Sequence, residues 1–594
     1  MKTTTKRRLF WLLSPFLVLF TANFIVRISG LPGLDNPTSI GAFVDDQLPS
    51  IAPTTSNIEL TPVYPGIQWE SPIVAIPFPL TNNMLMVEMD GRFFTLDKDE
   101  NTTSRNLILD LQDRSWYYDW SGPGTKHGGI QNVVFHPQFG LGQGKDYIYV
   151  YYILDPSFAG VSSGYYDRLS RFSWNGTAFD KSSELVMINQ YDTSRGHDGS
   201  GMAFGNDGFL YVAVGDEGTQ NGAATPHTQK IDDRFRSGVW RIDVDEQGGN
   251  ISHPIIRQPN GSNVPAGGLP SMTQGYYIPN DNPWVDPTGG TLEEFYAIGL
   301  RQPFRMTIDP PTGNFWIGDV GGGQREEVDI MDGPGYNYEW NYKEGNQNGF
   351  RAAPNPLIGT PRAPIHDYDR TIGRCVIGGY VYRGNDIPEL QGKYIFGDNG
   401  TNLIFALSHG GANLNNGVEQ ITSITGAGAV FSGMSSFGLN HDNEMLVLKL
   451  GAGVLGNGKV YRISTTNSGN NEAFPPLLSQ TGVFSDLSNL TPSAGVMPYD
   501  VNNPLWSAGT DKLRWVAIPN DGVIDSPDEQ ISYSEEGNWN LPIGTVFIKQ
   551  FNNPDGKKLE TRVWIHGTDS VWFGATYKWN ANDTDADLLL GGLE

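Results

Sequence analysis

The chain has 594 residues, and its 40 Lys and Arg residues face 65 Asp and Glu residues, which gives a net charge of −25. This length exceeds what one hydrophobic core normally supports, so two domains are expected. The acidic balance disfavours binding to phosphate backbones and anionic lipid surfaces, and no basic stripe interrupts it. We therefore predict no nucleic-acid partner.

The composition favours an all-β fold. Gly occurs 73 times, the chain holds 15 Trp, 25 Tyr and 29 Phe, and only 18% of residues are charged, which is typical of short strands and tight turns. Cys375 is the only cysteine. It excludes an intrachain disulfide, a Cys-x-x-Cys zinc site and a Cys-x-x-Cys-His haem attachment, so any redox cofactor must be held by oxygen and nitrogen atoms.

The N-terminus has the pattern of an export segment. Lys2, Lys6, Arg7 and Arg8 precede a mostly apolar run over 9–26, which indicates a signal peptide or signal anchor within 1–30. The protein is thus expected to be exported to the periplasm, the cell surface or the medium, with cleavage left open. Residues 31–65 are rich in Pro, Thr, Ser and Gly without sustained periodicity, and we interpret them as a linker.

Residues 66–464 repeat one motif without a fixed period: an apolar residue, a turn built from Pro, Asn, Asp or Gly, and then a strand of aromatic and branched residues. Examples are FGNDGFLYVAVGD at 204–216 and IDPPTGNFWIGD at 308–319. Short strands with variable loops over this length predict a β-propeller, and a β-sandwich is the competing interpretation. After a polar boundary at 465–472, alternating strands such as DKLRWVAIP predict a second, smaller β domain up to residue 594.

Two hairpins of the predicted propeller carry candidate catalytic groups. His197 stands in a Gly-rich loop before the hairpin turn Asn206-Asp207-Gly208, and Asp216 follows the second strand of that hairpin. Arg301 precedes the next similar hairpin. A His oriented by a carboxylate can act as a general base near neutral pH, and a permanently charged Arg can stabilise a developing oxyanion. The alternative is that His197 caps a loop and Asp216 only shapes a turn.

A glycine run follows the second hairpin. Gly321, Gly322 and Gly323 stand close to Glu326 and Glu327. Bare carbonyl groups beside carboxylates form the oxygen-only environment that Ca²⁺ prefers, so we predict a Ca²⁺ site here. The alternative is that Glu326 and Glu327 are solvated surface residues.

Four ordered motifs resemble the glucose/sorbosone dehydrogenase family over roughly 66–464. They are GGIQNVVFHPQFG, GHDGSGMAFGNDGFLYVAVGD, the stretch AIGLRQPFRMTIDPPTGNFWIGDVGGGQREEVDI with GYNYEW, and GGYVYRG with LQGKYIFGD. The resemblance implies a six-bladed propeller. The family includes sugar dehydrogenases that use pyrroloquinoline quinone (PQQ), and also the non-enzymatic propellers of hedgehog-interacting proteins.

The resemblance also implies roles for individual residues. His197 would be the base that removes a sugar hydroxyl proton, Asp216 would support it, and Arg301 would lie near the quinone carbonyl. The carbonyls of Gly321 and Gly322 would bind the Ca²⁺ that polarises PQQ. Glu327 and Tyr338 match a further structural Ca²⁺ site.

The chain departs from the family at the expected cofactor contacts. Gln302 replaces an Asn after the arginine, and His127 replaces a Gln, so the predicted cofactor-binding residues are His127, Arg301 and Gln302. The cations that would hold the PQQ carboxylates fall on uncharged residues, and basic side chains from loops are the predicted substitutes. The uncharged residues are Gly400, Gly433 and Ser435, and the substitutes are Lys126, Arg374 and Lys449.

The leading hypothesis is an exported PQQ- and Ca²⁺-dependent oxidoreductase that oxidises an aldose sugar or related alcohol. No haem motif follows the C-terminal segment, which resembles β domains that precede c-type cytochrome domains, so a separate electron acceptor such as a cytochrome c or a quinone is expected. One alternative is a non-catalytic, Ca²⁺-stabilised propeller that binds a glycan or an exported protein. A further alternative is a Ca²⁺-dependent hydrolase on a similar scaffold.

Overall fold

The structure is a computed structural model that describes most of the chain. The described residues are 38–51, 57–119, 126–162, 164–194, 196–218, 227–354, 356–408, 418–420, 433–451, 454–466, 474–503, 509–523, 526–535 and 537–589. They form two compact units, one over 57–465 and one that combines residues before 57 with residues from 466 onward. The predicted export segment lies outside the described residues. Within the described residues, no helix is both long and apolar enough to span a bilayer.

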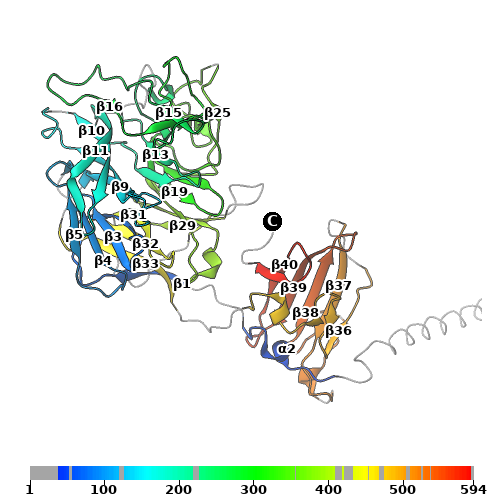
Figure 1. The fold of residues 1–594 in the computed structure, drawn as a ribbon. Helices are drawn as coiled ribbons and strands as arrows, with labels where there is room; N and C mark the ends of the chain where they lie inside the picture. The colour runs from blue at the N-terminus through cyan, green and yellow to red at the C-terminus, as the bar shows by residue number, and fades with distance from the viewer. Residues whose placement is uncertain are drawn as a thin grey trace, which may run out of the picture. The chain divides into compact units, whose positions relative to one another are not determined.

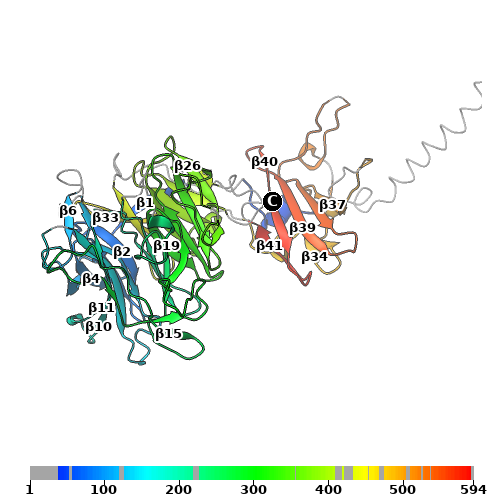
Figure 2. The ribbon, with the colours of Figure 1, turned by 90° about the horizontal axis from the view of Figure 1, so that it is seen from above.

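The larger unit is the six-bladed β-propeller that the sequence predicts (Figure 1, Figure 2). Its described strands form six sheets of at least four strands each, and in every sheet the four strands of the blade pair antiparallel. In order from the inner to the outer strand, the sheets are β2 (Pro72–Pro77), β3 (Asn83–Glu88), β4 (Arg92–Asp97) and β5 (Asn106–Asp110); β8 (Ile130–Phe135), β9 (Tyr147–Leu154), β10 (Tyr165–Trp174) and β11 (Phe179–Asp192); β12 (Gly201–Phe204), β13 (Leu210–Val214), β14 (Gly238–Ile242) and β18 (Phe295–Ile298); β19 (Pro303–Asp309), β20 (Asn314–Asp319), β21 (Arg325–Met331) and β26 (His366–Asp369); β27 (Val376–Val381), β28 (Tyr394–Asp398), β29 (Ile404–Leu407) and β30 (Val418–Gln420); and β31 (Met434–Leu439), β32 (Met445–Lys449), β33 (Lys459–Thr466) and β1 (Asn57–Val63).

The inner strands close a ring. β2 contacts β8, β8 contacts β12, and the series continues through β19, β27 and β31 back to β2. Because consecutive inner strands run in the same sense relative to this ring, the loops that precede them meet at one end of the central channel. That end holds the loops before β12 and β19, where His197 and Arg301 stand.

Tight turns and buried strands explain why the blades form. The Asn206-Asp207-Gly208 turn joins β12 to β13, with Gly208 at a φ of +83° that favours glycine, and all five residues of β13 are buried. Each buried Val or Leu there contributes roughly 1.5–3 kcal/mol. Smaller elements decorate the blades: β6 (Tyr117–Asp119), β7 (Lys126–Gly128), η1 (His227–Gln229), β15 (Ser252–Pro254), β16 (Met272–Thr273), β17 (Tyr277–Pro279), β22 (Tyr336–Asn337), β23 (Lys343–Glu344), β24 (Gln347–Asn348), β25 (Thr360–Pro361) and η2 (Pro388–Leu390).

The segment interpreted as a linker differs from that prediction at both of its described parts. Residues 57–63 form β1, the outer strand of the last blade, where Ile58, Leu60 and Val63 are buried. Ile40 and Phe43, around the single turn α2 (Ala42–Asp46), belong to the hydrophobic core of the other unit. These apolar residues are too few to produce a periodic pattern. Their packing partners also lie hundreds of residues away, so the local sequence gives no sign of them.

The smaller unit is β-rich, as predicted. Its six-stranded antiparallel sheet packs one face onto a core that includes Trp515, Val563 and Tyr577. The sheet consists of β36 (Val496–Pro498), β37 (Asp511–Ala517), β38 (Val546–Asn552), β39 (Lys558–His566), β40 (Trp572–Trp579) and β41 (Ala586–Leu589). The hairpin of β34 (Phe484–Asp486) and β35 (Thr491–Pro492) and the short turns η3 (Leu478–Gln480) and η4 (Pro527–Glu529) complete the unit.

A buried carboxyl in the third blade makes the stability depend on pH. Glu294 is 1% exposed, accepts a hydrogen bond of 2.7 Å from the Tyr276 hydroxyl, and burial raises its pKa to about 7. A raised pKa means that the folded state holds the proton more tightly, so this stabilisation is complete below about pH 4 and is lost as the pH rises through about 7. We therefore expect Glu294→Gln, which keeps an acceptor for Tyr276, to raise the melting temperature relative to the parent above pH 7.

At pH 8.5 the gain corresponds to at most about 3 kcal/mol, and it disappears near pH 4. Thermal melts of both proteins over this pH range measure it. Glu246→Gln, at an exposed position of the same blade, serves as the control and should show no pH-dependent difference. A Glu294→Gln gain that does not change between pH 4 and 8.5 would contradict the assignment of a buried, titrating carboxyl.

Candidate active site

The structure brings His197, Asp216 and Arg301 together at one end of the central channel. His197 lies in the loop between β11 and β12, Asp216 follows β13, and Arg301 precedes β19. The main chains of the two blades are joined here, since the Asp216 N–H donates to the Arg301 carbonyl at 2.8 Å. Residues more than a hundred positions apart therefore meet at the edge of two adjacent blades.

Asp216 holds His197 in a fixed orientation. His197 Nδ1 lies 2.6 Å from Asp216 Oδ1, while Trp340 Nε1 donates to Asp216 Oδ2 at 2.8 Å and the Gly218 N–H donates to Oδ1 at 2.9 Å. The Asp216 side chain is fully buried, whereas 24% of the His197 side chain is exposed. A buried carboxylate thus orients an imidazole that solvent or a ligand can still reach.

Electrostatics keeps Asp216 ionised. Burial alone would raise the pKa of this carboxyl, but the hydrogen bond and charge of His197, the charge of Arg301 and the hydrogen bond from Trp340 outweigh burial and lower it. Asp216 is therefore a carboxylate at neutral pH, and it accepts the Nδ1 proton of His197. This leaves Nε2 as the ring nitrogen that can accept a proton from a substrate.

The backbone around His197 is tightly packed. His197 adopts a φ of +63°, and a Cβ on Gly215 would stand only 1.9 Å from the His197 carbonyl oxygen. Glycine at 215 is therefore required for this close approach. Gln302 adds a side-chain contact, since its Oε1 accepts a hydrogen bond of 3.3 Å from the Gly199 N–H.

Arg301 presents an unused donor. Its side chain is buried, Nη1 donates to the Val320 carbonyl at 2.8 Å, and the guanidinium carbon lies 5.4 Å from the Trp340 ring centre. Asp319 accepts the Arg301 main-chain N–H at 2.8 Å, and burial raises the pKa of Asp319 to about 7. The Arg301 Nε–H is buried without a hydrogen-bond partner, so it is available to an acceptor on a ligand.

The predicted Ca²⁺ residues lie in the loop after β20, on β21 and beside β22. Gly321 has no room for a side chain, because a Cβ would stand 1.5 Å from the Arg325 carbonyl oxygen. The buried Glu344 carboxylate shapes the loop by accepting the N–H groups of Gly323 and Gln324, each at 2.7 Å. The glycine loop is thus held in one conformation with its main chain close to Trp340 and Arg301.

The two further predicted metal residues do not form a side-chain ligand pair. The Tyr338 hydroxyl donates to the Ile330 carbonyl at 2.9 Å, which leaves its main-chain carbonyl as the atom it could offer to a cation. Glu327 is buried and accepts the Gly345 N–H at 2.6 Å; burial and then repulsion by Asp329 and Asp319 raise the pKa of Glu327 well above its ordinary value.

The other residues predicted at the cofactor contacts have different local surroundings. His127 lies on β7, but its side chain and that of Lys126 are outside the described residues. The Ser435 hydroxyl donates to the carbonyls of Pro72 and Leu448, so it faces neighbouring strands. Arg374 packs against Gly400, where a Cβ would stand 3.1 Å from the Arg374 Cβ, while Lys449 Nζ donates to the Asn457 carbonyl.

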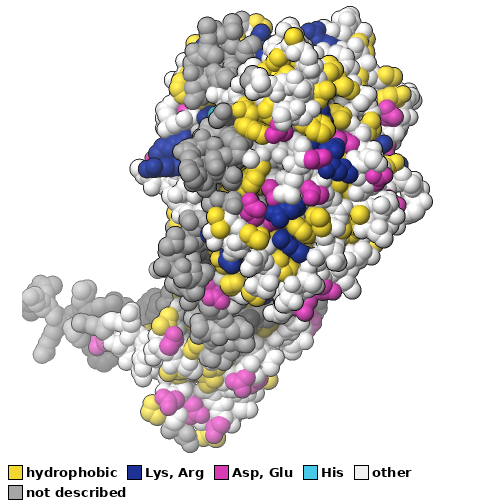
Figure 3. Space-filling view, turned by 90° about the vertical axis from the view of Figure 1, so that its left-hand side faces the viewer, with side chains coloured by type: hydrophobic (Ala, Val, Ile, Leu, Met, Phe, Trp, Pro, Cys, Tyr) yellow, Lys and Arg dark blue, Asp and Glu magenta, His cyan; other side chains and the backbone are white. Residues whose placement is uncertain are grey.

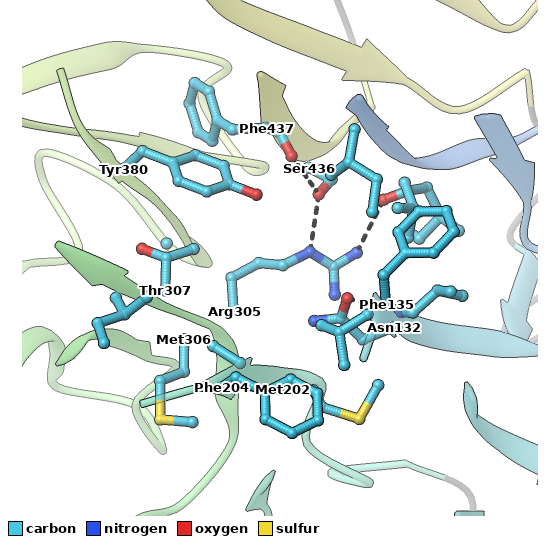
Figure 4. A pocket seen from close by; sticks show the side chains of 18 of the residues that line it. Asn132, Phe135, Met202, Phe204, Arg305, Met306, Thr307, Tyr380, Ser436 and Phe437 are labelled. Atoms are coloured by element: carbon cyan, nitrogen blue, oxygen red, sulfur yellow. Dashed lines mark hydrogen bonds between the residues drawn. The ribbon is translucent and has the colours of Figure 1, made fainter. Parts of the chain in front are cut away.

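The channel beyond the site contains a cavity of about 340 Å³ lined by residues of all six inner strands. Arg305 lies at its centre and donates to Ser436 Oγ (Figure 4), and it also donates to main-chain carbonyls of neighbouring blades. On the face in Figure 3, Lys and Arg side chains lie among Asp and Glu side chains. Trp340, Glu344 and Arg305 are site or channel residues that the sequence did not single out.

The sequence model of one family, described as Glucose / Sorbosone dehydrogenase, matches residues 71–242 and 257–423, which is more than half of the chain. The chain belongs to this family. The matched region contains His197, Asp216 and Arg301, which confirms the resemblance on which their predicted roles depend.

The curated relatives that the chain matches include HIPL and Hedgehog-interacting proteins on the one hand and an aldose sugar dehydrogenase on the other. The HIPL1 protein of Arabidopsis thaliana is 30% identical over 244 residues, which are 39% of this chain and 32% of the relative. The Hedgehog-interacting protein of Mus musculus is 28% identical over 46% of this chain and 34% of the relative. The aldose sugar dehydrogenase YliI of Escherichia coli K12 is 22% identical over 46% of this chain and 62% of the relative. The chain spans only about a third of the length of the plant relatives that it matches.

Solved structures also resemble the chain. The apo-form of the soluble aldose sugar dehydrogenase from Escherichia coli aligns with a TM-score of 0.47 at 18% identity, covering 69% of this chain and 100% of that chain. The PQQ-bound aldose sugar dehydrogenase from Streptomyces coelicolor aligns with a TM-score of 0.46 at 13% identity, covering 70% of this chain and 99% of that chain.

Proposed function

We propose that this family member is an exported oxidoreductase that oxidises an aldose sugar or related alcohol with PQQ and Ca²⁺. The observation that carries the proposal is the 2.6 Å contact between His197 Nδ1 and the buried Asp216 carboxylate, next to the unpaired Nε–H of Arg301. A general base and an oxyanion-stabilising donor at one channel end are what proton removal from a sugar hydroxyl needs.

His197 Nε2 accepts the hydroxyl proton of the substrate. Asp216 holds the Nδ1–H tautomer before this step and stabilises the imidazolium after it, because its carboxylate is buried and remains charged. The partly exposed imidazole lets a small sugar approach from solvent. Electrons pass onward to a separate acceptor, such as a cytochrome c or a quinone.

The residues fit the reactive end of PQQ. The buried Arg301 Nε–H suits the quinone carbonyl, and the carbonyls of Gly321 and Gly322 would hold Ca²⁺. Gln302 would contact the quinone beside Arg301, and the family resemblance assigns a further contact to His127. When bound, the quinone supplies the hydride acceptor. At the carboxylate end, Arg374, which packs against Gly400, would take the place of the cation that the family pattern has at position 400.

A non-catalytic propeller that binds a glycan or an exported protein is the second candidate. Two uncharged residues favour this second candidate: Gly433, and Ser435, whose hydroxyl already donates to main-chain carbonyls. They leave the PQQ carboxylates with fewer cations than the family pattern supplies. In that case Ca²⁺ would serve as a structural element only. Ligand binding would then survive the loss of His197.

A reconstitution experiment distinguishes the two candidates. We expect the purified full chain with Ca²⁺ to melt at a higher temperature when PQQ is added, and to reduce a dye acceptor with at least one member of an aldose panel. His197→Ala should keep the PQQ-dependent shift in melting temperature and lose about 10²–10⁴-fold in turnover. Dye reduction by the parent protein no faster than by His197→Ala would reject the oxidoreductase, and absence of a PQQ-dependent shift would favour the binding propeller.

A further inference from the structure

Three aspartates converge at the loop that carries His197. Asp167 lies on β10, Asp192 ends β11, and Asp198 follows His197 in the loop that leads to β12. One carboxylate oxygen from each lies within 4.8 Å of the other two. Asp167 pairs with Gln190 in the sheet, so Asp192, two residues further along β11, points to the same face as Asp167.

Two of these carboxylates are buried with an oxygen that has no partner. Asp167 is 4% exposed and Asp192 is fully buried, and neither Asp167 Oδ1 nor Asp192 Oδ2 has a hydrogen-bond partner. The other Asp192 oxygen accepts the Ser194 N–H at 2.7 Å. Leaving buried carboxylate oxygens unpaired is costly, so these atoms indicate that a cationic ligand belongs between them.

The nearby arginines are committed to a fourth carboxylate. Arg236 Nη2 forms an ion pair with Glu217 Oε2, Arg234 Nη1 lies 3.9 Å from the same oxygen, and Gln190 Nε2 donates to Glu217 Oε1 at 3.4 Å. Within the described part of the chain, no basic side chain forms an ion pair with the three aspartates. Four acidic groups thus share two arginines, and the local excess is the charge of one divalent cation.

The electrostatics of the cluster agree with this count. Burial and then repulsion by Asp198 and Glu217 raise the pKa of Asp167 well above its ordinary value, and burial and repulsion by Glu217 raise the pKa of Asp198 to about 7. A bound cation would remove this repulsion. Without it, the carboxylates must share protons at neutral pH.

We propose that Asp167, Asp192 and Asp198 bind a divalent cation, for which the oxygen-only ligand set favours Ca²⁺. This site is separate from the Ca²⁺ site predicted at Gly321 and Gly322, which follow β20 in the fourth blade. The cation ties the end of β11 to β10 and to the residue after His197, whose main-chain carbonyl also accepts a 2.8 Å hydrogen bond from the Tyr151 hydroxyl.

The consequence concerns the orientation of His197. Asp198 and Glu217 directly follow His197 and Asp216 in the chain, so a cation here fixes the backbone on which the imidazole stands at its φ of +63°. The role of His197 as a base, and hence this effect on catalysis, rests on the proposed function. The cation site itself does not.

The test uses the full chain stripped with a chelator and then titrated with Ca²⁺ alone. We expect Asp167→Asn/Asp192→Asn to bind one Ca²⁺ fewer per chain than the parent by calorimetry and elemental analysis. It should also lose a Ca²⁺-dependent rise of several degrees in melting temperature. Without Ca²⁺ the order of the two melting temperatures reverses. The double variant then melts above the parent, because neutral amides replace carboxylates that repel each other in the parent. This reversal also shows that the variant folds.

Glu294→Gln is the matched control, because Glu294 is an equally buried carboxyl of the propeller and belongs to neither predicted cation site. It should retain the Ca²⁺ that the double variant loses. Hydrogen exchange gives a readout independent of PQQ and substrate. Added Ca²⁺ should slow exchange in peptides covering 196–204 in the parent and in Glu294→Gln, but not in the double variant. Equal Ca²⁺ stoichiometry in parent and double variant would overturn the proposal. A parent that is stabilised by acidification but not by Ca²⁺ would overturn it too, since the carboxylates would then share protons.

Discussion

Asp216→Asn is expected to lower kcat about 10²–10⁴-fold with a much smaller change in KM. The Asp216 carboxylate accepts from donors on both oxygens: His197 Nδ1 and the Gly218 N–H on Oδ1, and Trp340 Nε1 on Oδ2. An amide places its NH₂ against one of these donors. If the NH₂ faces His197, the imidazole must adopt the Nε2–H tautomer, which cannot accept a substrate proton. Steady-state dye reduction with PQQ, Ca²⁺ and the best sugar measures the loss.

A second variant separates tautomer from charge. Asp216→Asn/Trp340→Phe removes the indole N–H, so the amide can turn its NH₂ toward the phenyl ring and its oxygen toward His197 Nδ1. We expect this double variant to recover part of the activity of Asp216→Asn, while Trp340→Phe alone remains close to the parent. Asp216→Asn with kcat within threefold of the parent would show that Asp216 does not orient the base.

The fold was largely predictable because its signals are local. Turns such as Asn206-Asp207-Gly208 and Pro311-Thr312-Gly313 mark where strands reverse, and strands such as β13 are apolar throughout. The strand β1 was not predictable in this way. It completes the last blade by pairing with β33, some four hundred residues later, and no local pattern records that partner.

The candidate site was predictable only where residue type implies chemistry. His197, Asp216 and Arg301 are titratable or charged groups in Gly-rich loops, and the ring closure of the propeller brings them together. Trp340 was not singled out, because an aromatic residue in a strand-rich chain is normally interpreted as part of the hydrophobic core. Its role depends on an indole N–H that meets Asp216 across more than a hundred residues. Asp167 and Asp192 were not singled out either. In the sequence they are ordinary carboxylates within strands, and only the pairing of β10 with β11 brings them to the same face.

Arg305 extends the argument from the site to the scaffold, and Arg305→Ala is expected to destabilise the propeller by about 2–4 kcal/mol. Its guanidinium donates to Ser436 Oγ at 2.8 Å (Figure 4), to the Gln131 carbonyl at 3.1 Å and to the Ile73 carbonyl at 3.4 Å. These partners belong to or adjoin three other blades. Alanine removes all three bonds and leaves the acceptors facing an enlarged cavity. Urea unfolding of the parent and the variant, followed by tryptophan fluorescence, measures the difference.

Arg305→Gly is the informative comparison, since Arg305 adopts a φ of +85° that favours glycine. Both variants lose the same hydrogen bonds, but only glycine relieves the backbone strain, so it should unfold at a higher urea concentration than Arg305→Ala by an amount equivalent to about 1 kcal/mol. The contrary result is that both variants unfold at the same urea concentration as the parent. The cost of burying the guanidinium charge, which also lowers the pKa of Arg305 to about 10, would then cancel the contribution of its three hydrogen bonds. The central arginine would then be neutral for stability, and the ring of inner strands would hold through its apolar packing alone.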